Sequence, residues 1–313
     1  MTHFAICLRP ELLNDWKAMI FTNGLSAPEG PVALPDGTWL IVEGGAERGC
    51  VTHISADGSN KSVVKKTGRP NGLAVDSRGV IWVAESKHPS LVRLTMDGKA
   101  EVVATACDGQ PFLFPNDLCF GPDGALYLTD SGVIIDEFAP NNKIRPDYMN
   151  VTYNGRVYRI DVSTAKVEML DSGIKFTNGI AFGPDRLLYV NETLTGNIYR
   201  YEQHPGRTAL RRVLFGNVIR PDAPPGWKGP DGMAFSADGK LYVAVFGQRD
   251  VTVLGADGKV VERIPTAGVL PTNLAFALPK RKKIYITEYE LGQMEVVDVP
   301  ADGLPLFNGK RAG

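Results

Sequence analysis

One pattern recurs six times along the chain and restricts the fold more than any other feature of the sequence. Each copy begins with Pro or Thr followed by Glu, Asn or Asp, and continues as two short β-rich strands joined by a polar turn. The copies start with PEGPVA at Pro28, PNGLAV at Pro70, PNDLCF at Pro115, TNGIAF at Thr177, PDGMAF at Pro230 and TNLAF at Thr272. Internal repeats of such units are typical of solenoids, propellers and related arrays.

The spacing of the copies selects one of these architectures. Their polar second residues are separated by 42, 45, 62, 53 and 42 residues and are Glu29, Asn71, Asn116, Asn178, Asp231 and Asn273. A repeat of about 40 to 50 residues made of short strands is the signature of a β-propeller. The 34 glycines and 22 prolines supply tight hairpin turns such as Pro122-Asp123-Gly124. We therefore predict an all-β fold, a six-bladed β-propeller.

The last copy has one strand too few. After its hairpin only QMEVVDV, from Gln293, has strand character before a tail that contains Gly and Pro. We expect AMIFT, from Ala18, to supply the missing outer strand, so that an N-terminal strand closes the last blade and no edge stays open. Residues 1–313 then form a single propeller domain, with segment 1–16 and tail 300–313 at its periphery.

Bulk properties exclude several classes of protein. The net charge is -1 and the only dense basic run, Lys280 to Lys283, is short, which argues against a nucleic-acid partner. Neither a signal peptide nor a membrane-spanning segment is recognisable, so we expect a cytoplasmic protein. The widely spaced Cys7, Cys50, Cys107 and Cys119 are expected to be reduced thiols. A closed ring predicts a monomer or a weak homo-oligomer.

The ring is expected to gather the polar second residues at one end of its axis. Glu29, Asn116, Asn178 and Asp231 offer carboxylate and amide oxygens, the ligands that hard divalent cations prefer. Each residue alone is also an ordinary turn former, so the prediction depends on the set. We predict a divalent cation, calcium first, with zinc, manganese and iron as alternatives. Asn71 and Asn273 are expected to contact the substrate rather than the metal.

The motifs EGP at Glu29, PND at Asn116, TNGI at Asn178 and PDGMAFSADGKLYVA at Asp231 resemble the senescence marker protein 30, gluconolactonase and luciferin-regenerating-enzyme family. The resemblance runs from about Ala18 to Val299. It implies a six-bladed propeller whose axial metal is bound by Glu29, Asn178 and Asp231, with Asn116 touching metal or substrate. The more distantly similar diisopropylfluorophosphatase and paraoxonase group uses a Glu, two Asn and an Asp in comparable places.

One departure from the family concerns the substrate. Members that hydrolyse sugar lactones place an Arg shortly before the residue matching Asn116, where this chain has Gln110 to Pro115, QPFLFP. Phe112 and Phe114 predict a more apolar pocket, shared with Trp227 and His88; packing of both rings under a long loop is the alternative. The long segments 131–154 and 216–229 are expected to form pocket walls, with surface insertions as the alternative.

These features predict a metal-dependent hydrolase, a gluconolactonase-like carboxylic ester hydrolase that opens a lactone or small ester. The cation would polarise the substrate carbonyl, Asn116 would orient the substrate, and Asp231 is the candidate catalytic base. HExxH and GxSxG motifs are absent from the sequence, which disfavours a zincin or a serine hydrolase. The alternatives are a phosphotriesterase-type hydrolase on the same metal site, or a non-catalytic binding scaffold with a structural calcium.

Overall fold

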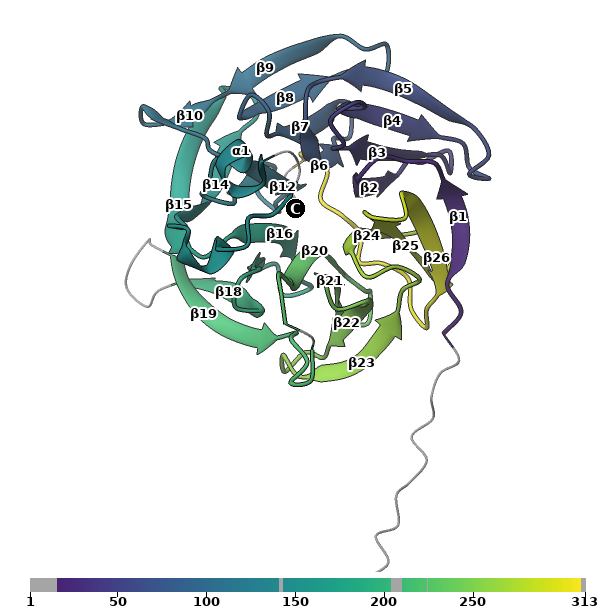
Figure 1. Ribbon diagram of the computed structural model, residues 1–313. Coiled ribbons are helices and arrows are strands. Elements are labelled where there is room, and N and C mark those ends of the chain that lie inside the picture. Colours follow the sequence, from purple (N-terminus) through teal and green to yellow (C-terminus); the bar gives the residue numbers. More distant parts are fainter. Residues whose placement is uncertain (1–15, 141–142, 204–209, 224, 311–313) are drawn as a thin grey trace, which may run out of the picture.

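Six antiparallel sheets of four strands each stand around a central axis like the blades of a propeller (Figure 1). This computed structural model describes residues 16–140, 143–203, 210–223 and 225–310. The helical elements that lie wholly within these ranges are α1 (Ile135–Phe138) and one 3-10 turn, η2 (Tyr148–Asn150). The predicted all-β, six-bladed fold is confirmed.

Each blade runs from an inner strand at the axis to an outer strand at the rim. Blades one to three consist of β2 (Pro28–Ala33), β3 (Trp39–Glu43), β4 (Cys50–Ile54) and β5 (Lys61–Lys66); β6 (Pro70–Val75), β7 (Ile81–Glu85), β8 (Ser90–Leu94) and β9 (Ala100–Ala104); and β12 (Pro115–Phe120), β13 (Leu126–Asp130), β14 (Gly155–Asp161) and β15 (Lys166–Ile174). A small hairpin, β10 (Ala106–Cys107) and β11 (Gln110–Pro111), precedes β12.

Blades four to six follow the same order along the chain. They consist of β16 (Thr177–Phe182), β17 (Leu188–Glu192), β18 (Asn197–Gln203) and β19 (Leu210–Asn217); β20 (Gly229–Phe235), β21 (Leu241–Phe246), β22 (Asp250–Leu254) and β23 (Val260–Pro265); and β24 (Pro271–Phe276), β25 (Lys283–Glu288), β26 (Gln293–Asp298) and β1 (Met19–Asn23). The predicted N-terminal strand is therefore confirmed as the outer strand of blade six, where Met19 pairs with Val296 and Asn23 with Gln293.

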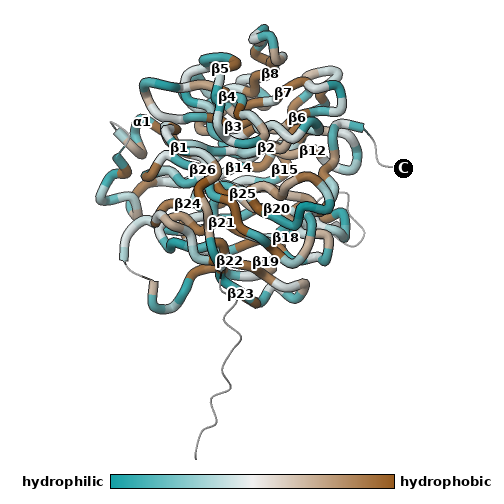
Figure 2. Tube along the Cα trace, turned by 90° about the vertical axis from the view of Figure 1, so that its right-hand side faces the viewer, coloured by the Kyte–Doolittle hydropathy of each residue, from teal (hydrophilic) through white to brown (hydrophobic). Residues whose placement is uncertain are grey.

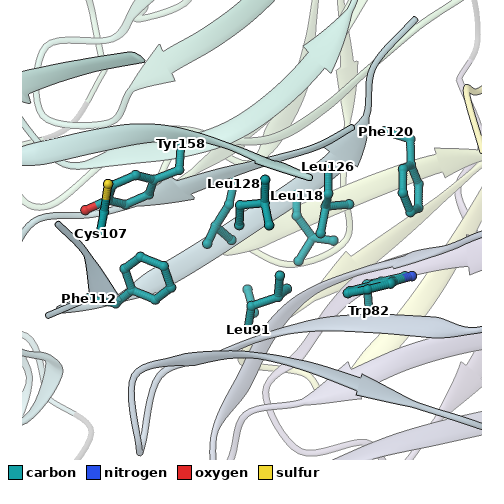
Figure 3. Close-up of a cluster of buried hydrophobic side chains, with 11 residues drawn as sticks. Trp82, Leu91, Cys107, Phe112, Leu118, Phe120, Leu126, Leu128 and Tyr158 are labelled. Carbon is teal, nitrogen blue, oxygen red and sulfur yellow. The ribbon is translucent and has the colours of Figure 1, made fainter. Parts of the chain in front are cut away.

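Apolar side chains between neighbouring blades hold the ring together. Strands such as β3 and β7 are buried along their whole length because both of their faces are covered by adjacent blades. Figure 3 shows the cluster between blades two and three, in which Trp82 and Leu91 meet Phe120 and Leu128. Each large apolar side chain that is fully buried stabilises the folded protein by about 1.5–3 kcal/mol relative to its exposure in the unfolded chain.

The C-terminal tail crosses the axis on the face opposite to α1 (Figures 1 and 2). The Leu304 N–H donates to the Phe235 carbonyl at 2.8 Å, and the Ser77 N–H donates to the Asn308 carbonyl at 2.9 Å. The Phe307 ring lies 5.9 Å from the Phe182 ring. Residues 300–310 thus cover the carboxyl ends of the inner strands instead of lying at the periphery, because the apolar Leu304 and Phe307 pack there.

Cys50, Cys107 and Cys119 are free thiols, as expected. Cys7 and segment 1–16, apart from Trp16, lie outside the described residues. Trp16 packs on blades five and six, where its Nε1 donates to Glu262 at 2.8 Å. Among the described residues, no helix has the length and apolar character needed to cross a membrane.

Candidate functional site

An irregularity near the start of every inner strand interrupts the regular ladder at or next to the polar second residue. The register between the inner and second strand shifts in all six blades, for example between Glu29 and Val32 and between Pro230 and Met233. Such β-bulges are common beside active sites because they re-aim a side chain. The repeat therefore delivers six polar side chains to one end of the axis.

The glycine after the polar residue lets neighbouring inner strands come close. A Cβ at Gly72 would stand 2.6 Å from the Asn116 carbonyl oxygen, and one at Gly179 would collide with the carbonyl oxygen of Asp231. Only a residue without a side chain fits these positions. The glycines of the repeat thus allow the axial residues of adjacent blades to approach one another.

Carboxylates at the end of the second strand fix the connector that leads into the inner strand. They accept backbone N–H bonds of 2.7 to 2.9 Å in five blades: Ser26 to Glu43, Arg69 to Glu85, Leu113 to Asp130, Lys175 to Glu192 and Leu270 to Glu288. All five of these acidic residues are buried. Each of them holds the backbone two or three residues before an axial side chain.

Three carboxylates lie close together near the axis. Glu29, Asp117 and Asp231 are each less than 9% exposed. Burial, followed by the charges of Asp231 and Asp117, raises the pKa of Glu29 well above its ordinary value. Burial and the charge of Asp117 raise the pKa of Asp231 well above its ordinary value, and burial raises that of Asp117 to about 7. Asp117, the third residue of the PND motif, was missed by the sequence analysis.

Amide side chains connect these carboxylates. The Asn178 side chain donates to Asp231, and the Asn273 side chain donates to both Glu29 and Asp117. Asn71 Nδ2 donates to Asn116 Oδ1 at 3.2 Å. The structure thus links all six predicted axial residues in three pairs, each between successive copies around the ring, and it places Asn273 between two carboxylates. 

Hydroxyl groups anchor two of the amides on the next blade. Asn116 Nδ2 donates to Ser131 Oγ at 2.9 Å, and Ser131 Oγ donates to the Thr177 carbonyl at 2.8 Å. In the same way, Asn178 Nδ2 donates to Thr193 Oγ1 at 3.2 Å, and Thr193 donates to the Pro230 carbonyl at 2.8 Å. The nitrogen of each amide is engaged in this way, and among the described residues no hydrogen bond to the Oδ1 oxygen of Asn178 is formed.

The donor set fits a hard divalent cation. Across the described ranges, Glu29, Asp117 and Asp231 form no ion pair with Lys, Arg or His, and burial makes uncompensated negative charges costly. Within those ranges, three His, Cys, Asp or Glu side chains do not gather tightly enough to bind an ion by themselves. Amide oxygens from the asparagines supply the additional hard ligands that such an ion requires.

Phe112 is a core residue, which corrects its predicted role in substrate binding. Its side chain is 2% exposed and its ring lies 5.0 Å from the Tyr158 ring, inside the cluster between blades two and three (Figure 3). The β10–β11 hairpin, in which Cys107 pairs with Gln110, directs the ring into this cluster. Full burial among apolar neighbours leaves no surface for a substrate.

Phe114 and Trp227 belong to a separate aromatic cluster that both long segments build. Phe114 lies 5.9 Å from Phe176, Phe176 lies 5.0 Å from Trp227, and Phe138 of α1 lies 4.9 Å from Trp227. Phe114 packs beneath the 131–154 segment, while Trp227 is half-buried. Because Phe114, Phe176 and Trp227 each stand two to four residues before an axial residue, the cluster flanks the axial site at blades three to five. His88 is exposed in the loop after β7.

Known proteins are similar to this chain in sequence and in fold. The SMP-30/Gluconolactonase/LRE-like region matches residues 88–290. A gluconolactonase of Zymomonas mobilis is 29% identical over 60% of this chain, which spans about half (52%) of that relative's length. A diisopropyl-fluorophosphatase of Loligo vulgaris is 28% identical over 86% of this chain and 88% of its own.

Solved structures agree with the family match. A gluconolactonase from Xanthomonas campestris superposes with a TM-score of 0.75 at 25% identity, covering 92% of this chain and 91% of that chain. A calcium-binding protein, regucalcin, from Agrobacterium tumefaciens gives a TM-score of 0.70 at 19% identity, covering 92% and 97%, and shows the same fold. The family model covers well over half of the chain, and the chain accordingly belongs to the SMP-30/Gluconolactonase/LRE-like family.

Proposed function

We propose that this protein is a metal-dependent hydrolase that opens a lactone or a small ester. The observation that carries the proposal is the group of buried axial carboxylates without a cationic partner among the described residues, bound to amides at one end of the ring. The similarity to gluconolactonases and to diisopropyl-fluorophosphatase supports hydrolysis as the reaction class.

Glu29, Asn178 and Asp231 would hold the ion, and Asn116 would either complete this set or contact the substrate. A divalent cation bound there would act as a Lewis acid on the carbonyl oxygen of the substrate. The all-oxygen donor set favours calcium, in line with the calcium-binding name of the regucalcin structure. Zinc, manganese and iron are the ions to compare with it.

The residues around the ion have separate tasks in this proposal. Asn116 orients the substrate through its amide, which Ser131 and Asn71 hold in place. Asp231 accepts a proton from the water that attacks the carbonyl carbon. Trp227, which the buried Phe138 and Phe176 support from behind, presents an apolar wall to the substrate and reduces the access of bulk water.

The proposal is tested by hydrolysis assays after chelation and metal replacement. Aldonolactones, aliphatic lactones, aryl esters and paraoxon are each assayed with calcium, zinc, manganese or iron. Metal-dependent opening of a lactone or ester is the expected result. Turnover of paraoxon alone would favour a phosphotriesterase, for which the diisopropyl-fluorophosphatase relative is the specific support. Absence of all turnover with a tightly bound ion would favour a binding scaffold.

Replacement of Thr193 with valine is expected to weaken calcium binding about 10-fold, because it removes the hydroxyl that holds the Asn178 amide. Isothermal titration calorimetry of calcium measures the effect. The variant T193S keeps the hydroxyl and is expected to bind like wild type. Equal calcium affinity of T193V and wild type would show that the hydroxyl does not orient the amide.

Calcium is expected to raise the melting temperature more at pH 8 than at pH 5.5. In the metal-free protein, burial raises the pKa of Asp117 to about 7 and lifts those of Glu29 and Asp231. Folded-state pKa values above the unfolded ones stabilise the fold at low pH, and this stabilisation is lost as the pH rises through about 7. The ion binds the ionised carboxylates. It is therefore expected to restore more stability at pH 8, where these groups are charged, than at pH 5.5.

Thermal unfolding with calcium and with a chelator, at both pH values, measures this difference. The variant D257N, which removes an exposed turn carboxylate paired with Lys259, is the control and is expected to behave like wild type. A calcium effect that is independent of pH would contradict the assignment of the buried carboxylates to the ion.

A further inference from the structure

Arg69 stands in the connector that leads into β6, two residues before Asn71. Its N–H donates to Glu85 Oε1 at 2.7 Å, and its carbonyl oxygen accepts from the N–H and hydroxyl of Ser86 at 3.0 and 2.8 Å. These bonds fix the backbone at the axial end of blade two, where Asn71 contacts Asn116. The Arg69 side chain therefore starts at the same end of the ring as the proposed metal site.

The Arg69 guanidinium is half-buried and, throughout the described part of the chain, has neither a hydrogen bond nor an ion pair. The nearby acidic groups Glu85 and Asp136 form no hydrogen bond with it in the described part of the chain, and Glu85 Oε2 is buried without a hydrogen-bond partner. Glu85 Oε1 accepts the backbone N–H groups of Arg69 and Lys87, and Asp136 lies 4.0 Å from Lys87 Nζ. Two other arginines on this face have partners: Arg48 pairs with Glu43, and Arg249 donates to backbone carbonyls.

Groups from three parts of the ring act on Arg69 at once. Burial lowers the pKa of its guanidinium, while Tyr289, Asp136 and Glu85 act in the opposite direction. Tyr289 follows β25 in blade six, Asp136 belongs to α1 of blade three, and Glu85 ends β7 of blade two. Figures 1 and 2 show α1 on one face of the ring, over blade three and between the axis and the rim. Groups from blades two, three and six therefore lie around the connector that carries Arg69, at the end of the ring where Asn71 lies.

The chemistry of a free guanidinium defines its ligand. Its planar fork of N–H donors matches the two oxygens of a carboxylate, whereas a dianionic phosphate calls for additional cations. A guanidinium kept half-buried without an acceptor loses hydration that such a ligand would replace. The aromatic cluster lies at blades three to five, so the charged and the apolar parts of the mouth are contributed by different blades.

We propose, building on the hydrolase function above, that Arg69 binds a carboxylate of the substrate, so that the site selects lactones or esters that carry a free carboxylate. Arg69 contacts a part of the substrate that does not react, while the axial residues act on the scissile carbonyl. Binding of the remote carboxylate positions that carbonyl.

The test compares two substrates that differ in one group, a γ-lactone with a ring carboxylate and the same lactone with a primary carboxamide. Wild type is expected to prefer the carboxylate by about 100-fold in kcat/KM, and R69M is expected to abolish this preference while leaving turnover of the carboxamide unchanged. R69K keeps the charge but not the fork and is expected to fall between them. R93M, which removes an exposed arginine paired with Glu101, is the control.

Equal loss on both substrates in R69M, or no preference in wild type, would overturn the assignment. If wild type hydrolyses neither lactone with any of the metals, the proposed function fails, and the inference about Arg69 is then decided by calorimetry with the lactone carboxylate. Binding to wild type that weakens at least 10-fold in R69M supports it. Equal binding to both proteins, or no binding to wild type, contradicts it.

Discussion

Replacement of Asp231 with asparagine is expected to remove tightly bound calcium and to lower kcat/KM by about 100-fold or more. The carboxylate supplies one of the negative charges of the ion site and the proposed base, and asparagine supplies neither. The metal-free variant is also expected to be more stable than metal-free wild type at pH 8, because the charge of Asp231 contributes to the raised pKa of Glu29.

Metal content by atomic spectroscopy, lactone turnover and thermal unfolding in chelator measure these three effects. The variant is expected to lose activity but to gain stability in chelator. A variant that merely damages the fold would lose both stability and activity. Asp257 provides the control, because it lies in a hairpin turn of the same blade and D257N leaves the axis untouched. Unchanged metal content and turnover in D231N would refute the proposed site.

Replacement of Phe112 with alanine is expected to lower the free energy of unfolding by about 3–5 kcal/mol, because removal of the buried ring leaves a cavity in the cluster between blades two and three. At a temperature where the variant is folded, kcat/KM is expected to stay within about 2-fold of wild type, because the ring does not reach the site.

Equilibrium denaturation at a fixed calcium concentration gives the stability, and a lactone assay gives the activity. F112L retains most of the volume and is expected to cost less than about 1.5 kcal/mol. A large rise in KM in F112A with little change in stability would restore Phe112 to the substrate pocket.

The two phenylalanines show where sequence reasoning stops. Phe112 and Phe114 are two residues apart in an otherwise irregular segment. The segment has no hydrophobic periodicity that would show which of the two rings faces the core and which faces a pocket. In the structure the segment follows the β10–β11 hairpin, and Phe112 lies beside Tyr158 while Phe114 lies beside Phe176. Side-chain direction after a short hairpin depends on three-dimensional pairing that the sequence does not display.

The repeat was sufficient to predict the blades, the closing strand and the set of axial residues, because each copy carries the same turn and strand signals. Asp117 escaped notice because four copies have glycine at its position and one has leucine, so a carboxylate there falls outside the repeat. Ser131 and Thr193 were hidden for another reason. They act across the boundary between blades, a relation that comparison of aligned copies does not reveal.

The bonds from Ser131 and Thr193 to carbonyls of the following blade have a consequence for how the molecule assembles. The amide that each hydroxyl holds is oriented only once two consecutive sheets have docked, and Glu29 meets Asp231 only when the circle is complete. An unfinished chain would therefore lack the complete set of proposed ion ligands. Calcium bound at the proposed site would stabilise the closed toroid without speeding the formation of any individual sheet.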